Sequence, residues 1–491
     1  MIEKFKLKWV YFISALFIAF NCYLLTKELY WALAIPLVAI MAILFVFSLE
    51  TVFFLSIFAT PLSLTLKDLD LGFTVSMPGE PLMFGMLVVF FIKLFYDERL
   101  DRKFLKHPIT ILILIHLSWM LITTITSELP LVSFKYLLSR LWFVVPFYFM
   151  AIMLFQKEKF TKRFIWAYTL TLMIVIVYTT IRHSQVGFDE EIGHWVMDPF
   201  YNDHTAYGVI TAMFLPVLVF FTFDTGQKKS SRMFAIVAAS FVAMALYLSF
   251  SRAAWISLVF ALGVLIIAIL KIKFRWVFLV TATLVGLFFA FQQQILDKLE
   301  KNKQDSSANF IEHVQSISNI SSDASNLERI NRWQAAIRLF ETRPYMGWGP
   351  GTYQFVYAPF QLSKEKTIIS TNAGDKGNAH SEYIGPLAEE GFPGTLIRLI
   401  LYALVVYYGF KVYKEAAERR HRQMAMALTL SMIAYFIHGI MNNFLDTDKA
   451  SVPFWGFIAI IVCFDVYYPK RTANNHTDKI EPERANPPDS L

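Results

Sequence analysis

The sequence predicts an all-α polytopic membrane protein with a large, structured outer loop. Three observations predict this fold class: 56% of the 491 residues are hydrophobic, only 17% are charged, and the apolar residues form long blocks. Blocks of about 16–21 apolar residues are long enough for a helix to cross a hydrocarbon core roughly 30 Å thick. A soluble chain of this length would carry a larger charged share and divide into several domains.

Fourteen apolar blocks are candidate transmembrane helices. Several are short, and the pair within 29–66 could be re-entrant, so twelve helices are the alternative. Either number is even and places both termini on the same side of the membrane. The candidates are 9–25, 29–48, 51–66, 81–96, 108–126, 141–155, 164–181, 205–223, 233–250, 253–270, 276–291, 395–410, 424–444 and 452–468.

Lysine and arginine gather on one side of these spans. With the N-terminus inside, the inner segments hold 27 of the 45 basic residues, the short outer segments 8, and one long outer loop the other 10. Because short cytoplasmic loops carry such an excess, both termini are predicted to be cytoplasmic. A nucleic-acid partner is not expected, since it would require basic residues and aromatics together on one aqueous face.

This orientation divides the chain into six segments. The basic N-terminus runs into an apolar block without a small-residue cleavage site, so an uncleaved first span is expected. Both cysteines, Cys22 and Cys463, fall in predicted spans and indicate neither a disulfide framework nor a metal cluster. The segments are N-terminal spans (1–182), an outer loop (183–204), further spans (205–291), the large outer loop (292–394), the last spans (395–468) and a disordered cytoplasmic tail (469–491).

The large outer loop is too long to be a simple connector. Its part from Gln304 to Ser325 is polar and is expected to be a mobile surface segment. Asn326 is expected to cap a helix that runs to Glu341. Pro344 would end this helix, and a glycine-rich turn follows. The helix is expected to bury one apolar stripe, formed by Ile330, Trp333, Ile337 and Phe340.

Three residues on the outer side are candidates for chemistry, and each also has an ordinary structural interpretation. Arg252 follows Ser251 between two spans, where an arginine marks a functional site or snorkels to the interface. Arg329 and Trp333 share a face of the loop helix, although from these residues alone a solvated arginine beside a core tryptophan is the favoured interpretation. His380 precedes a span and either caps it or accepts a proton from a hydroxyl nucleophile. Competing arginines nearby are Arg332, Arg338 and Arg343.

No metal site or cofactor is predicted. The pairs Asp68/Asp70 and Asp446/Asp448 resemble the metal-binding pairs of nucleotide-sugar transferases, but on the outer side they are interpreted as solvated acids. The cluster from Asn202 to His204, with His194, lacks a specific ligand spacing.

An outer site has no ATP or sugar nucleotide available. Group transfer there needs a donor that is activated before it crosses the membrane, typically a glycan on a polyprenyl pyrophosphate. Arginine suits the pyrophosphate, because its planar fork binds phosphate bidentately and keeps its charge. Histidine suits the acceptor hydroxyl, because it can take the proton near neutral pH.

Five ordered segments together resemble the bacterial O-antigen ligase and polymerase superfamily. The resemblance covers about residues 198–394 and includes the large outer loop. The segments are Asp198-Pro-Phe-Tyr-Asn-Asp-His-Thr-Ala206, Ser251-Arg-Ala-Ala-Trp255, Arg329-Ile-Asn-Arg-Trp333, Pro344-Tyr-Met-Gly-Trp-Gly-Pro-Gly351, and His380-Ser-Glu-Tyr-Ile384 with Glu389-Glu-Gly391.

The resemblance implies a helical, C-type-glycosyltransferase-like protein of the bacterial inner membrane with a periplasmic active site. It implies metal-independent, inverting transfer of a glycan from undecaprenyl pyrophosphate to a lipid A-core or another glycan acceptor. By this analogy Arg252 and Arg329 hold the pyrophosphate, and His380 activates the acceptor. Further residues of these motifs are expected to contact substrate: Ser251, Asn202, His204, Arg332, Trp333, Tyr383 and Glu389.

Two positions depart from the family pattern, and three functions stay open. The family often has asparagine where this chain has Ser381 and His204, which affects the identity of the acceptor more than the reaction class. A ligase is the leading interpretation, and a polymerase that uses the same donor is the first alternative. A lipid-glycan flippase or other transporter is the second, with Glu50, His116 and His438 as the few ionisable residues within spans.

Overall fold

The computed structural model describes residues 2–30, 34–66, 75–96, 100–273, 324–366, 370 and 377–471, with scattered positions between 275 and 290. Within these ranges the chain is mostly helical, as predicted, and adds one antiparallel hairpin, β1 (Leu64–Leu66) with β2 (Val75–Met77). Four predictions fall outside the described residues: the Asp68/Asp70 pair, most of the span 276–291, most of the polar loop segment and nearly all of the tail.

Nine of the described helices are long and apolar enough to cross a membrane. The first helices, α1 (Ile2–Thr26), α2 (Ala34–Phe47) and α3 (Leu49–Ala59), have shorter apolar stretches, so fourteen spans stay a prediction. The nine are α4 (Gly79–Tyr96), α6 (Pro108–Ile125), α7 to α8 (Pro130–Phe155, with the π-helical turn η3 at Val145–Met150), α9 (Glu158–Gln185), α11 (His204–Phe223), α12 (Lys229–Leu248), α13 (Arg252–Ile269), α19 (Ile384–Glu415) and α21 (Asp448–Tyr467).

A further long helix, α20 (Arg419–His438), starts with basic residues and packs between α11, α13 and α19. Shorter elements connect the long helices. They are η2 (Thr60–Leu62), α5 (Arg102–Leu105), α10 (Glu190–Gly193), α18 (Tyr353–Val356), η4 (Ala358–Phe360) and η5 (Ser363–Glu365).

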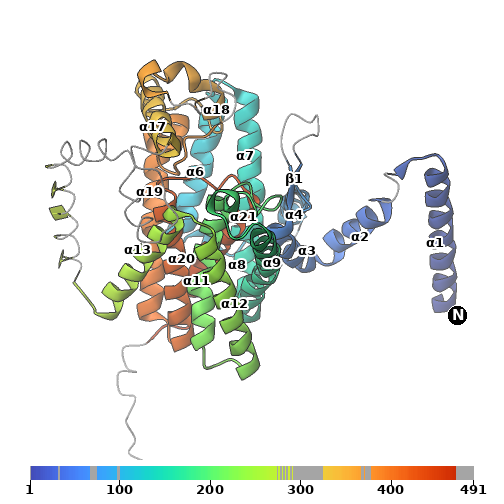
Figure 1. Ribbon diagram of the computed structural model, residues 1–491. Helices are drawn as coiled ribbons and strands as arrows, with labels where there is room; N and C mark the ends of the chain where they lie inside the picture. Colours follow the sequence, from blue (N-terminus) through green and yellow to red (C-terminus); the bar gives the residue numbers. More distant parts are fainter. Residues whose placement is uncertain are drawn as a thin grey trace, which may run out of the picture.

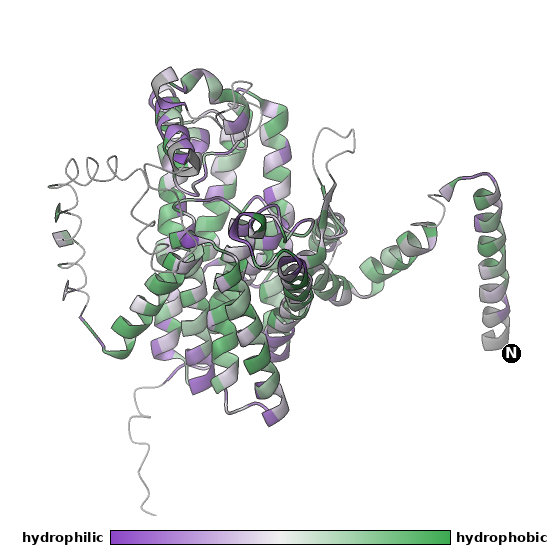
Figure 2. Cartoon of the chain, viewed as in Figure 1, coloured by the Kyte–Doolittle hydropathy of each residue, from purple (hydrophilic) through white to green (hydrophobic). Residues whose placement is uncertain are grey.

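Helix α21 forms the centre of the bundle (Figure 1) and is buried from Asp448 to Asp465. Around it, phenylalanines from several helices pack edge to face, such as Phe155 on Phe164 with ring centroids 5.4 Å apart. The outer surface of the bundle is largely apolar along the helix middles, while hydrophilic residues gather at the helix ends and over α17 (Figure 2). This distribution fits a bundle with its middle in a bilayer.

Ion pairs join the loops at one end of the bundle, which we call the inner end. Arg420 contacts Glu158 at 3.1 Å and Asp224 at 2.7 Å, and so links the starts of α20 and α9 to the α11–α12 loop. Asp465 at the end of α21 contacts Lys470 at 2.9 Å and Lys411 at 3.2 Å. These are the loops whose basic residues predict a cytoplasmic location, so the fold gathers them on one side.

The loop helix α17 (Ala324–Thr342) lies at the opposite, outer end of the bundle, where it packs against α19 (Figure 1). It begins before Asn326, which is therefore inside the helix and not its cap. The predicted apolar stripe is wrong, because Ile330 and Ile337 are each 37% exposed. The helix instead buries a face of small residues that allows close packing against the loops and α19, formed by Ala335, Ala336 and Leu339.

Helix α19 begins at Ile384, ten residues before the predicted end of the outer loop. Its start is capped by Ser381, whose Oγ accepts hydrogen bonds from the backbone N–H groups of Tyr383 and Ile384, both at 3.3 Å. Gly391 interrupts the helix with a φ of +69°, and a side chain there would overlap the carbonyl oxygen of Tyr345. This kink therefore requires glycine and lets the segment after α17 pack against α19.

Candidate active site

Helix caps place two of the predicted residues at the outer end. Asp203 caps α11, because its Oδ1 accepts hydrogen bonds from Thr205 N and Ala206 N, both at 2.8 Å, and His204 becomes the first helical residue. Ser251 is fully buried and caps α13 in the same way, through Ala254 N at 3.4 Å, so that Arg252 begins α13.

The two caps lie next to each other because α11 carries a glycine where it faces α13. A Cβ atom on Gly208 would come within 2.7 Å of the Ser251 Cβ, so only glycine permits this contact. The side chain of His204 consequently lies within electrostatic range of both Arg252 and Arg329. The side chain of His438, at the end of α20, interacts electrostatically with Arg329, Asp203 and His204. The two predicted arginines thus converge on one place from α13 and α17.

His380 approaches this cationic cluster from the loop before α19. Its φ is +47°, and its N–H donates a hydrogen bond to Asn378 Oδ1 at 3.0 Å, which holds this left-handed turn. Burial, with the positive charges of Arg332 and Arg329 next in size, lowers the pKa of His380 to about 4. The imidazole is therefore neutral at physiological pH and can accept a proton.

A second arginine of α17, Arg332, contacts His380 directly. Its Nη1 is 3.4 Å from His380 Nε2 and donates to the carbonyl of Asn378 at 3.2 Å. Its Nε donates to Glu328 Oε1 at 2.9 Å in a buried ion pair. Because its charge is compensated by Glu328, Arg332 is suited to positioning the His380 loop.

The remaining predicted residues lie around this cluster. Asn202 and Glu389 line an adjoining cavity, and Glu389 accepts a hydrogen bond from Tyr353 N at 3.0 Å. Trp333 is half-buried on α17. Tyr383 is not brought to the cluster through its hydroxyl, which donates to the carbonyl of Phe436 at 2.8 Å and joins α19 to α20.

A buried ionic network anchors the His380 loop, and the sequence analysis missed it. Glu382 accepts hydrogen bonds from Tyr435 OH at 2.7 Å, Phe444 N at 2.8 Å and Leu445 N at 3.0 Å. Arg398 joins it to a second carboxylate, with 3.3 Å to Glu382 and 2.9 Å to Glu390. The signal was present in the sequence, because Arg398 is a charged residue within a predicted span.

His116, considered above as a residue of a transport pathway, belongs to this network. Its Nε2 lies 2.8 Å from Glu390 Oε2, and both residues are buried between α6 and α19. The network therefore connects α6, α19 and α20 below the His380 loop, and gives His116 a structural partner.

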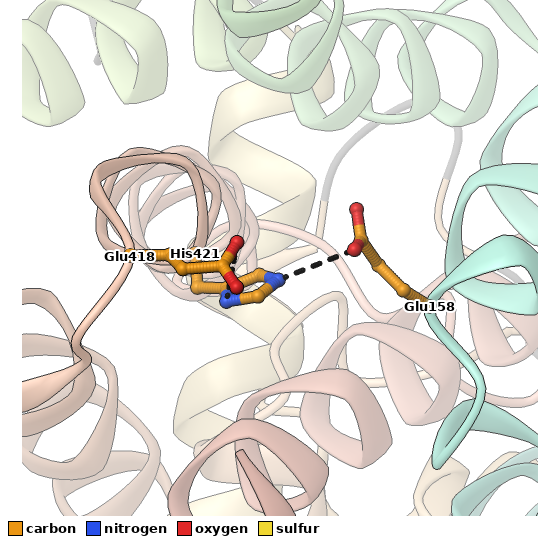
Figure 3. Close-up of side chains that lie close together, drawn as sticks. All are labelled: Glu158, Glu418 and His421. Atoms are coloured by element: carbon orange, nitrogen blue, oxygen red, sulfur yellow. Dashed lines mark ion pairs between the residues drawn. The ribbon is translucent and has the colours of Figure 1, made fainter. Parts of the chain in front are cut away.

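One group among the described residues has the composition of a metal site, but its geometry fits an ion-pair cluster better. Figure 3 shows Glu158, Glu418 and His421 at the inner end of the bundle. His421 directs Nε2 towards Glu158 and Nδ1 towards Glu418, each at 3.6 Å, so its two nitrogens face different carboxylates. Lys162 and Arg420 already contact Glu158, at 2.9 Å and 3.1 Å.

The metal candidates considered at the outer end have similar explanations. Asp446 contacts Arg140 at 3.0 Å, and Asp448 contacts Lys449 at 3.4 Å, so each carboxylate has a cation beside it. The rings of His194 and His204 stack with centroids 4.0 Å apart and planes 18° apart. Because nitrogen lone pairs lie in the ring plane, such a stacked pair does not direct both rings at one ion.

One comparison with known proteins finds a similarity over part of the chain. Residues 234–399 match the family model described as O-antigen ligase, a region that contains most of α12, all of α13 and α17, and the His380 loop. No curated protein matches the chain significantly. The helical bundle, the nine apolar helices and this match agree with the resemblance carried by the sequence motifs. The chain therefore has the helices of a multi-pass membrane protein, and its residues 234–399 are similar to the O-antigen ligase family.

Proposed function

We propose that this protein transfers a glycan from undecaprenyl pyrophosphate to an acceptor hydroxyl at the periplasmic face of the bacterial inner membrane, as an O-antigen ligase. The observation that carries the proposal is the convergence of Arg252 and Arg329 on His204, next to the neutral imidazole of His380. Two fixed cations beside a proton acceptor suit a diphosphate leaving group and a hydroxyl nucleophile.

In the proposed reaction, His380 takes the proton of the acceptor hydroxyl while the oxygen attacks the anomeric carbon of the donor. The bond between that carbon and the phosphate oxygen breaks, and its electron pair leaves with the undecaprenyl diphosphate. Arg252 and Arg329 stabilise the charge on the leaving group, a role that requires no metal ion. Attack opposite the leaving group inverts the anomeric configuration.

The direct test is transfer by the purified protein in lipid nanodiscs, with a defined undecaprenyl-pyrophosphate glycan, several acceptors and no nucleotide. We expect Arg252→Ala, Arg329→Ala and His380→Ala each to abolish transfer without loss of folded protein. Arg343→Ala is a matched control, because this arginine follows the same helix α17 and pairs with exposed Glu128 at 2.7 Å. Equal losses in the control and the site variants would contradict the assignment.

The requirement for a planar fork is tested separately with Arg252→Lys. Ammonium keeps the charge but cannot bind a diphosphate bidentately, so most activity should be lost. Full activity in this variant would remove the bidentate argument. A chelator should not inhibit the wild type, and strong inhibition would favour a metal-dependent reaction instead.

The polymerase alternative uses the same donor and differs in its product. In cells without this protein, accumulation of long lipid-linked polymer would indicate that a ligase is missing, whereas accumulation of single lipid-linked repeat units would indicate a polymerase. Transfer by the purified protein without any other component would exclude a pure transporter.

A further inference from the structure

A cavity of about 580 Å³ opens beside the His380 loop at the outer end of the bundle. Asn378, Ala379 and Ser381 line it, which are residues on either side of His380, and Asn202 lines it next to Asp203. The His380 loop and the segment before α11 therefore border both the cavity and the cationic cluster. Its volume lies in the range of cavities that bind small ligands.

The cavity has an open rim and a buried floor. Gln354, Phe355 and Asp446 at the rim are exposed, and the ring of Phe355 is 45% exposed. Trp142 and Asp448, from α7 and α21, lie deeper. An open rim with an aromatic ring and a polar floor is suited to a sugar chain, which stacks on aromatic faces and makes many hydrogen bonds.

Five buried polar atoms of residues that line the cavity have no hydrogen-bond partner among the described residues. They include the indole Nε1 of Trp142, a donor, and the carboxylate Oδ2 of Asp448, an acceptor, and Asp448 is only 1% exposed. Buried polar groups in native proteins nearly always have partners, so these atoms point to a polar ligand. A sugar hydroxyl can both accept from an indole and donate to a carboxylate.

Three cationic side chains of the described residues line the cavity, Lys135, Arg398 and Lys449, and the last two have ion pairs with carboxylates that also line it. Arg398 contacts Glu382 at 3.3 Å, and Lys449 contacts Asp448 at 3.4 Å. Two more carboxyl side chains, Glu80 and Glu389, also line the cavity. A carboxyl group hydrogen-bonds to sugar hydroxyls in either protonation state but does not attract an anionic ligand.

The cavity lies away from the helix that carries the first arginine. Helix α13 is the least buried of the nine candidate spans, with 17% of its window buried, so it offers a lipid-facing side for a polyprenyl chain. The helices that contribute most of its lining are α7, α11, α19 and α21, and none of the described lining residues belongs to α13. Because residues on both sides of His380 line the cavity, a glycan bound there would lie beside the proposed base and would be the acceptor.

We infer that this cavity binds the acceptor as a neutral, hydroxyl-rich oligosaccharide and disfavours uronic acids, with Trp142, Phe355 and Glu80 as specificity-determining residues. This inference rests on the proposed function, which supplies the role of His380. It adds the chemical class of the acceptor, which the Arg252, Arg329 and His380 assignments do not give.

The test measures disaccharide binding to the purified full-length protein in nanodiscs by calorimetry. The probes are chitobiose, which is neutral, and the hyaluronan disaccharide, which has similar size and one uronic acid. We expect chitobiose to bind roughly tenfold more tightly, as one uncompensated charge near a partly buried carboxylate implies. Equal binding, tighter binding of the uronic acid, or no binding of either probe would overturn the inference.

Two variants locate the binding site. Phe355→Ala should weaken chitobiose binding roughly fivefold to tenfold by removing the stacking surface. Asp446→Asn, at the exposed rim, should reduce the discrimination against the uronic acid. Glu365→Gln is the control, because Glu365 lies on the same outer loop outside the cavity and pairs with Arg338 at 2.5 Å. Unchanged binding in both cavity variants would contradict the location.

Failure of this inference and failure of the proposed function are distinguishable. Glycan transfer without chitobiose binding would overturn the acceptor cavity and leave the transferase intact. Selective chitobiose binding in a protein that transfers no glycan from the lipid donor would overturn the proposed function and leave a carbohydrate-binding cavity.

Discussion

His380 combines an uncommon backbone conformation with an environment that keeps its imidazole neutral. A left-handed φ is uncommon for residues other than glycine, and here Asn378 holds it through the His380 N–H. The side chain is held between the outer loop and the arginines of α17. Such a histidine can serve as a base only while it is deprotonated, so the consequence appears in the pH dependence.

The free protein should keep its activity at mildly acidic pH. The pKa of His380 is lowered to about 4, so the base is deprotonated above this value and becomes protonated as the pH falls through it. We expect kcat/KM for transfer to be nearly constant from about pH 8 to 5 and to fall below about pH 4. A pH profile with an acidic limb near 6.5 would show that the histidine is unperturbed or is not the base.

Arg332 should set the position of this acidic limb. Arg332→Gln removes a positive charge beside the imidazole. Loss of this charge stabilises the protonated form of His380, so its pKa rises and the acidic limb of the profile moves to higher pH. The pH profile of kcat/KM for the variant measures this shift. Arg338→Gln is a control on the same helix, because Arg338 pairs with Glu365. The acidic limb of the pH profile should stay in place in this variant.

At the scale of elements, the network around Arg398 joins α6, α19 and α20 below the site. Arg398→Leu would leave Glu382 and Glu390 buried without their common cation, and should destabilise the protein by about 3–5 kcal/mol. Thermal unfolding in detergent measures the loss as a lower Tm. The matched control is Arg163→Ala, which removes an exposed pair with Glu50 and should leave the Tm unchanged.

Helix α17 shows what the sequence could and could not predict at this scale. The prolines and glycines after it predicted its end to within one residue, because they cannot continue a helix. Its buried face was predicted wrongly, since the largest apolar residues were assumed to face inward. The face that packs is the one with alanines, because a loop helix above a membrane bundle approaches its neighbours most closely there.

For the whole molecule, the charge bias predicts which end faces the cytoplasm. A single cysteine at Gln354, in the exposed outer loop, should react with a membrane-impermeant maleimide in cells with a permeable outer membrane. A cysteine at Thr225, in the exposed α11–α12 loop, should react only after the inner membrane is opened. Both experiments use a chain with Cys22 and Cys463 replaced by alanine. The reverse labelling pattern would show that the protein has the opposite orientation in the membrane.

The sequence predicted most of the long helices and proposed the site residues, but it did not predict the contacts between them. Apolar blocks predict helices by their length, and short motifs predict Arg252, Arg329 and His380 as site residues. Contacts between distant segments are different, because they depend on the packing of all the helices. The pairing of Glu382 with Arg398 and the approach of Gly208 to Ser251 are such contacts: a charged residue within a predicted span suggests that Arg398 has a partner, but a single sequence does not show which residue it is.

The ion pairs at the inner end favour the proposed enzyme over the transporter alternative. A protein that works by alternating access has to separate its helices at both ends in each cycle. Here that would require Arg420 to leave both Glu158 and Asp224, and Asp465 to leave its two lysines, all in one movement. The transferase proposed above takes both substrates from the outer side and never needs this opening. Under that proposal the inner half can stay fixed throughout the reaction, and motion can be confined to the outer half.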